Sequence, residues 1–85
     1  DTRAVRVPRP GDVMVKGGFP GHAILLLDVV ERDGQRLVLV GEGFMPAQNF
    51  HVEKGPVSGW WRWEQGIELD HWTLSKDTLR RFPSQ

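Results

Sequence analysis

The sequence predicts a predominantly antiparallel β domain, built as a curved sheet or small open barrel of about five strands with one short C-terminal helical turn. An apolar run rich in β-branched residues extends from His22 to Arg32 and is typical of a buried central strand. Asp33-Gly34 follows it and is a hairpin turn signal. The apolar run Leu37-Val38-Leu39-Val40 then returns, so the two runs are expected to form a long antiparallel hairpin.

The segments before this hairpin are predicted to be an arm, a turn, a short strand and a loop. Prolines exclude a helix from residues 1–10, which are expected to form an extended arm. Pro10-Gly11-Asp12 predicts a turn, and residues 13–16 predict a short strand. The glycine-rich stretch 17–21 predicts a loop without a phosphate-binding signature, because no lysine-serine pair or helical pattern follows it.

The segments after the hairpin are shorter. The return strand is expected to run to about Phe44, with a bulge or a close backbone approach at Gly41 and Gly43. Ser75 is expected to cap a short helical turn that carries Leu79 and Phe82. The remaining predicted elements are a strand at 48–52, a tryptophan-bearing loop at 57–66, a last strand at 67–74, and the helical turn with its tail at 75–85. Residues 1–85 are thus expected to be a single or partial domain with its β core at 11–74.

Composition excludes several classes of function. Eleven basic residues balance eleven acidic ones, which argues against a nucleic-acid partner. The apolar run at 23–27 is too short to span a membrane. The chain has no cysteine, so it cannot itself supply a disulfide, a Cys-ligated zinc site or a cysteine nucleophile.

It begins at Asp1 without a methionine or a signal-like segment, which predicts a processed, excised or partial chain.

His22 and Glu42 are the first candidates for chemistry. His22 lies where the glycine-rich loop meets a buried strand, a position that can hold a general base rigidly. Symmetric pairing about the hairpin turn places Ile24 opposite Gly43, so Glu42 could orient the His22 ring. The alternatives are a structural histidine bonded to the backbone and a glutamate that points into solvent.

Other candidates are less specific. Gln48 could donate to an oxyanion, or be a surface polar residue. Trp60, Trp61 and Trp63 could stack on a ligand if exposed, or form the core if buried. The three histidines lack metal-ligand spacing, and a zinc site would need distant loops, so the sequence predicts no metal and no cofactor. Its serines lack a nucleophile-elbow context.

Two strings carry a family resemblance. Pro10-Gly11-Asp12-Val13 and Gly21-His22-Ala23-Ile24-Leu25-Leu26 resemble the core of the NlpC/P60-type cysteine peptidases and amidases, relatives of the papain-like fold. In that family a histidine opens the corresponding strand and is the catalytic base. The resemblance therefore implies that His22 is a base, and the Glu42 region resembles the place of the third polar residue.

A closer resemblance covers most of the chain. Val15-Lys16-Gly17-Gly18-Phe19-Pro20-Gly21-His22-Ala23, Phe44-Met45-Pro46-Ala47-Gln48, Trp72-Thr73-Leu74 and Leu79-Arg80-Arg81-Phe82 resemble the C-terminal part of a bacterial family of unknown function, numbered four-eight-four-six. This resemblance implies a larger domain, in which a helical part supplies a cysteine. It also implies thiol attack on an amide in an extracytoplasmic bacterial setting, with peptidoglycan peptides as the usual substrate.

The chain departs from this pattern in two ways. It has no cysteine, and it has Glu42 where related sequences place a glutamine. The resulting expectation is the sheet-bearing part of an NlpC/P60-like amide hydrolase, inactive alone, with catalytic residues His22, Glu42 and Gln48 and substrate contacts at Phe19, Trp60, Trp61 and Trp63. An upstream segment or another chain would supply the thiol. The alternatives are a non-catalytic module or pseudoenzyme that binds a glycan or peptide, and a plain structural domain.

Overall fold

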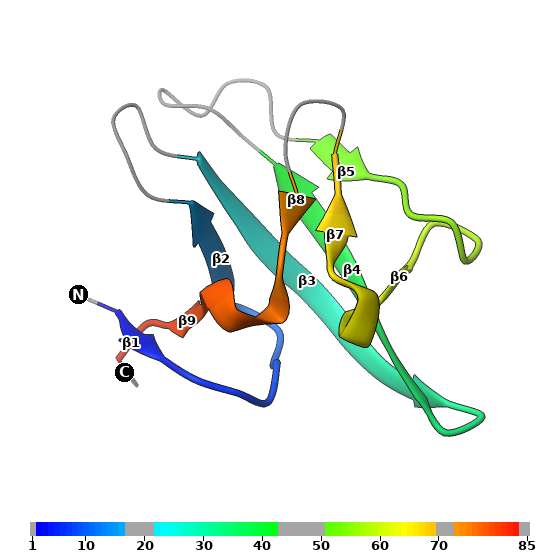
Figure 1. Ribbon diagram of the computed structural model, residues 1–85, viewed down its shortest axis with the longest axis horizontal. Coiled ribbons are helices and arrows are strands. Elements are labelled where there is room, and N and C mark those ends of the chain that lie inside the picture. Colours follow the sequence, from blue (N-terminus) through cyan, green and yellow to red (C-terminus); the bar gives the residue numbers. More distant parts are fainter. Residues whose placement is uncertain (1, 17–21, 43–50, 70–72, 84–85) are drawn as a thin grey trace.

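The computed structural model describes residues 2–16, 22–42, 51–69 and 73–83 and confirms a mainly β, antiparallel fold (Figure 1). A curved seven-stranded sheet forms most of it and is not closed into a barrel. The sheet order is β1-β9-β2-β3-β4-β5, and β6 also pairs with β4. The strands are β1 (Arg3–Ala4), β2 (Val13–Lys16), β3 (His22–Arg32), β4 (Gln35–Glu42), β5 (His51–Glu53), β6 (Trp61–Arg62) and β9 (Leu79–Arg81).

The predicted β3–β4 hairpin is confirmed, and its turn shows why. Asp33 and Gly34 both have positive φ, at 53° and 77°. Two such residues are what a two-residue turn needs if its twist is to match the strands. Arg32 pairs with Gln35 as the symmetric arrangement predicts.

The pairing does not stay symmetric along the hairpin, because β3 contains a bulge between Leu26 and Asp28. The extra residue shifts the register by one, so Ile24 lies opposite Glu42 and not opposite Gly43. The prediction of a bulge is wrong at Gly41, which pairs regularly with Leu25, and Gly43 lies outside the described residues. A one-residue shift changes which face each side chain occupies.

The core lies on one face of the sheet, under a smaller layer that contains a second, two-stranded sheet (Figure 1). That sheet pairs β7 (Ile67–Glu68) with β8 (Thr73–Leu74), so residues 67–74 form two paired strands and not one strand. Its two buried residues, Ile67 and Leu74, are register partners. The core residues are Met14, Ile24, Leu26, Val38, Val40, Trp61, Trp63, Ile67, Leu74 and Leu79.

The tryptophan segment is ordered structure where a loop was expected. Trp61 begins β6, which pairs with β4, and Trp63 begins the 3-10 helix η1 (Trp63–Gln65). Trp63 is 1% exposed and Trp61 is 8% exposed. The indole Nε1 of Trp61 donates a hydrogen bond to the Glu53 carbonyl at 2.8 Å. A small domain gains much of its apolar burial from such large rings, which explains why they lie inside.

The C-terminal turn is the 3-10 helix η2 (Lys76–Thr78). The Ser75 side chain makes no capping hydrogen bond, and the Thr78 hydroxyl instead donates to the Ser75 carbonyl at 2.8 Å. Leu79 does not continue the helical turn, because it begins β9, which pairs with both β1 and β2. Within the described residues, no helix has the length and apolar character needed to cross a membrane.

An ion pair fastens β9 to the start of the domain. Arg81 Nε donates to Asp12 Oδ1 at 2.7 Å, and its Nη2 donates to Asp12 Oδ2 at 2.8 Å. The Asp12 side chain is 2% exposed and also accepts the Arg9 backbone N–H at 2.9 Å. The hydrogen bonds donated to Asp12 raise the pKa of the Arg81 guanidinium above its ordinary value.

The first prediction concerns this pair. Arg81→Met should lower the free energy of unfolding by about 3 kcal/mol, because it leaves the buried Asp12 carboxylate without its cation. Arg80→Met is the matched control on the same strand, since Arg80 donates to the neutral Oγ1 and carbonyl of Thr2. It should cost about 1 kcal/mol. Urea unfolding followed by circular dichroism measures both, and equal losses would contradict the assigned role.

The second prediction concerns the tryptophans. Trp63→Ala should destabilise the domain by about 3 to 5 kcal/mol, because it removes a fully buried ring from the core. Trp60→Ala, at a half-buried ring three residues earlier in the chain, should cost clearly less. Thermal unfolding followed by circular dichroism compares them. A smaller loss at Trp63 than at Trp60 would show that the core is assembled differently.

Candidate functional site

The candidate site lies where β4 ends beside β5. Glu42, the last residue of β4, is the register partner of His51, the first residue of β5. Glu53 follows two positions later, and its partner is the buried Val40. Residues two apart on a strand share a face, and so do direct register partners. The pairing therefore gathers Glu42, His51 and Glu53 on one face of the sheet.

The three side chains meet. His51 Nε2 lies 4.0 Å from Glu42 Oε1, and it is hydrogen-bonded to Glu53 Oε1. One donor atom from each residue lies within 4.8 Å of the other two. Such a group can exchange a proton between the imidazole and a carboxylate, or can hold a cation.

Burial differs across the cluster. The side chain of Glu42 is 12% exposed and that of Glu53 is 23% exposed, whereas that of His51 is 54% exposed. The carboxylate of Glu42 thus lies on the inner side and the imidazole opens to solvent. A ligand or ion could therefore reach the cluster from the His51 side.

The core holds the cluster in place. Trp61 pairs with Val38 of β4, and its indole N–H donates to the backbone carbonyl of Glu53. A buried ring thus links β4 and β5 beside the cluster. Because Trp61 is fixed by core packing, the position of Glu53 relative to β4 is fixed as well.

The structure places His22 at the first residue of β3, where its backbone pairs with Lys16. Two residues later Ile24 pairs with Glu42, so the start of β3 does lie beside the end of β4 as predicted. The side chain of His22 lies outside the described part of the structure. Phe19, Gln48 and His71 also lie outside the described residues.

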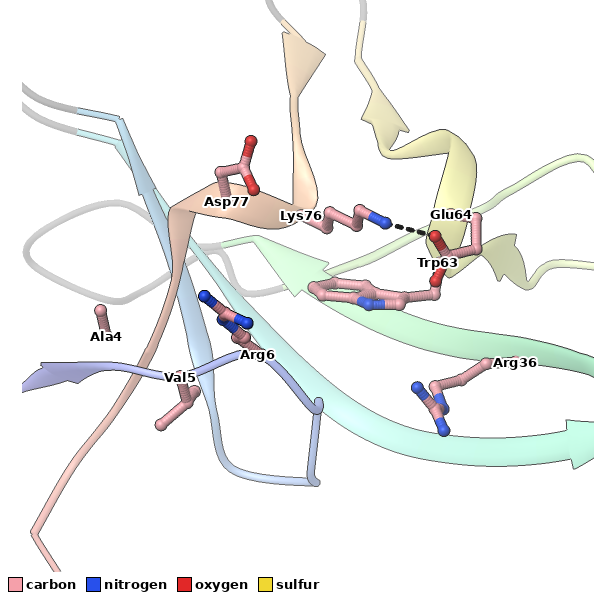
Figure 2. A pocket seen from close by; sticks show the side chains of 8 residues that line it. All are labelled: Ala4, Val5, Arg6, Arg36, Trp63, Glu64, Lys76 and Asp77. Atoms are coloured by element: carbon pink, nitrogen blue, oxygen red, sulfur yellow. Dashed lines mark hydrogen bonds and ion pairs between the residues drawn. The ribbon is translucent and has the colours of Figure 1, made fainter.

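The tryptophan candidates are largely buried. Trp61 and Trp63 are buried and Trp60 is half-buried, so two of the three rings offer no free face to a ligand. Trp63 contributes to the wall of a cavity of about 510 Å³, although the residue is only 1% exposed (Figure 2).

This cavity is rich in charge and separate from the Glu42 cluster. Arg6 and Arg36 line it, and Lys76 and Glu64 form an ion pair at its margin (Figure 2). Arg36 is at the start of β4 and Glu42 at its end, a separation of about 20 Å along a strand. The two sites therefore occupy opposite ends of the same strand.

Sequence reasoning did not single out the grouping of Glu42 with His51 and Glu53. The alternation in His51-Val52-Glu53 was a usable signal, because it places a histidine and a carboxylate on one face of a strand. Glu42 could be added to that pair only with the β4–β5 register known. Histidine spacing alone suggested distant loops, whereas the structure uses adjacent strands.

Comparisons with known proteins add one finding. No curated protein and no solved structure matches the chain. A family model does match residues 2–81, which is nearly the whole chain. The match spans every described strand, from β1 to β9. The chain therefore belongs to the family described as domain of unknown function (4846).

Proposed function

We propose that the chain is the sheet-bearing part of an amide hydrolase domain similar to the NlpC/P60 type, in which His22 is the general base. The observation that carries the proposal is the pairing of Ile24 with Glu42. It sets a nine-tenths buried carboxylate beside the strand that His22 opens. A base on a strand end and a carboxylate on the next strand are the arrangement that orients an imidazole.

In this proposal the nucleophile is a thiol from outside these 85 residues, because the chain has no cysteine. The imidazole of His22 takes the thiol proton, and the thiolate attacks the carbonyl carbon of an amide. The imidazolium then gives its proton to the leaving amine, and water hydrolyses the thioester. Glu42 holds the ring in one orientation and stabilises its charged form, and Gln48 donates to the developing oxyanion.

The proposed substrates are peptides of the peptidoglycan type in an extracytoplasmic bacterial setting, and both follow from the family resemblance. The sheet contributes the base, and the thiol-bearing part completes the site. The isolated chain is therefore proposed to be inactive.

A binding module is the second candidate, and the cavity beside Trp63 favours it. Two buried tryptophans leave little indole surface for stacking. A module would instead use the cavity, where Arg6 and Arg36 could bind a carboxylate of a peptide. This candidate needs neither His22 nor a thiol. Replacement of His22 would therefore abolish hydrolysis but would leave binding by a module unchanged.

The third prediction tests the hydrolase. In the intact protein, His22→Ala should lower kcat for amide hydrolysis by about 10² to 10⁴-fold, because the general base is lost. His71→Ala is the matched control, since it removes a histidine that the proposal does not use. Circular dichroism of both variants checks that the fold is retained. Undiminished hydrolysis in His22→Ala would refute the assignment.

The thiol provides an independent check. The coding sequence before Asp1, or a partner chain, should supply a cysteine at the start of a helix, and its replacement by alanine should abolish hydrolysis. If neither contains a cysteine, the hydrolase proposal fails and the binding module is favoured.

A further inference from the structure

We propose that Glu42, His51 and Glu53 form a binding site for a divalent transition-metal ion, with Zn²⁺ the best fit. The inference goes beyond the proposed hydrolase, because two of its three residues have no part in that chemistry. It rests on described residues alone and needs no thiol.

The distances suit a single ion. Zinc bonds to imidazole nitrogen and carboxylate oxygen are about 2.0 to 2.2 Å long, so two ligand atoms on one ion can be no more than about 4.4 Å apart. His51 Nε2 and Glu42 Oε1 are 4.0 Å apart, and the three donor atoms lie within 4.8 Å of one another. Small side-chain rotations would bring all three to one ion, which would replace the hydrogen bond between His51 and Glu53.

The ligand types select the metal. Imidazole nitrogen suits zinc and its neighbours in the first transition row, whereas magnesium and calcium prefer oxygen ligands throughout. One nitrogen and two carboxylate oxygens give three protein ligands, which leaves a fourth tetrahedral position for water or a ligand. No thiolate is required, so the lack of cysteine does not oppose this site.

Charge and burial support a cation. Two carboxylates face one imidazole, which can supply at most a single positive charge. The Glu42 residue is nine-tenths buried, and its Oε1 lies 4.0 Å from His51 Nε2, so water screens its attraction for a bound cation less than at an exposed site. A divalent ion balances both carboxylates at once.

The scaffold is ordered and the site can be reached. Backbone pairing between β4 and β5 sets Glu42 opposite His51, and the bond from Trp61 to the Glu53 carbonyl fixes the third position. Ligands held by rigid strands lose little freedom when they bind a metal. The half-exposed imidazole of His51 gives the ion a route from solvent.

The fourth prediction is that the intact protein, freed of metal by chelation, binds one Zn²⁺ per chain in isothermal titration calorimetry. His51→Gln and Glu53→Gln should each weaken binding by about tenfold or more, because each removes a ligand. Both positions are on a short strand at the sheet edge, and circular dichroism checks that each variant folds. Glu68→Gln, at an exposed glutamate of β7, is the matched control and should bind like the parent.

Two results would overturn the site: no saturable Zn²⁺ binding at millimolar metal, or equal affinity in the parent and in both ligand variants. Tighter binding of Mg²⁺ than of Zn²⁺ would contradict the assigned metal class. Calorimetry needs neither substrate nor thiol, so its failure leaves the hydrolase proposal standing. Conversely, loss of hydrolysis in His22→Ala does not decide metal binding.

Discussion

The β-bulge in β3 is the constraint on which the rest of the structure depends. One extra residue between Leu26 and Asp28 shifts the pairing with β4, so that Ile24 lies opposite Glu42. Without it, the part of β3 before the bulge would turn its other face to the core. The turn before β2 is bonded to the same place, because Gly11 N–H donates to the Leu26 carbonyl and Leu26 N–H donates to the Asp12 carbonyl. The bulge therefore lies where β3, β4 and the turn at residues 11–12 are hydrogen-bonded together.

The core and the candidate site are consequences of that register. Ile24, Leu26 and Val40 share the inner face and are fully buried, and Glu42 continues the same row at the end of β4. Trp61 packs into this core, and its indole N–H donates a hydrogen bond to the Glu53 carbonyl. This bond fixes the position of β5 relative to the core. The apolar row therefore ends in a buried carboxylate, and its Oε1 lies 4.0 Å from His51 Nε2.

The sequence predicted the features that depend on local patterns. The Asp33-Gly34 turn and the apolar runs beside it determine the hairpin, and the start of β3 was correctly expected beside Glu42. The bulge position could not be predicted, because it depends on contacts with the 11–12 turn. Burial of Trp61 and Trp63 could not be decided either, since an aromatic cluster fits a core and a binding surface equally well. Glu53 was missed because its partners come from the β4–β5 register.

Two carboxylates are buried among the described residues, and their surroundings differ. Asp12 is held by the paired donors of Arg81 and by the Arg9 backbone N–H, so its charge is matched and its geometry closed. This ion pair joins β9 to the turn before β2, and the carboxylate oxygens of Asp12 are already hydrogen-bonded. Glu42 instead faces an imidazole and a second carboxylate at an edge open to solvent. The proposed metal site uses this difference, because imidazole and carboxylate groups at an accessible edge can bind an ion that a closed ion pair cannot.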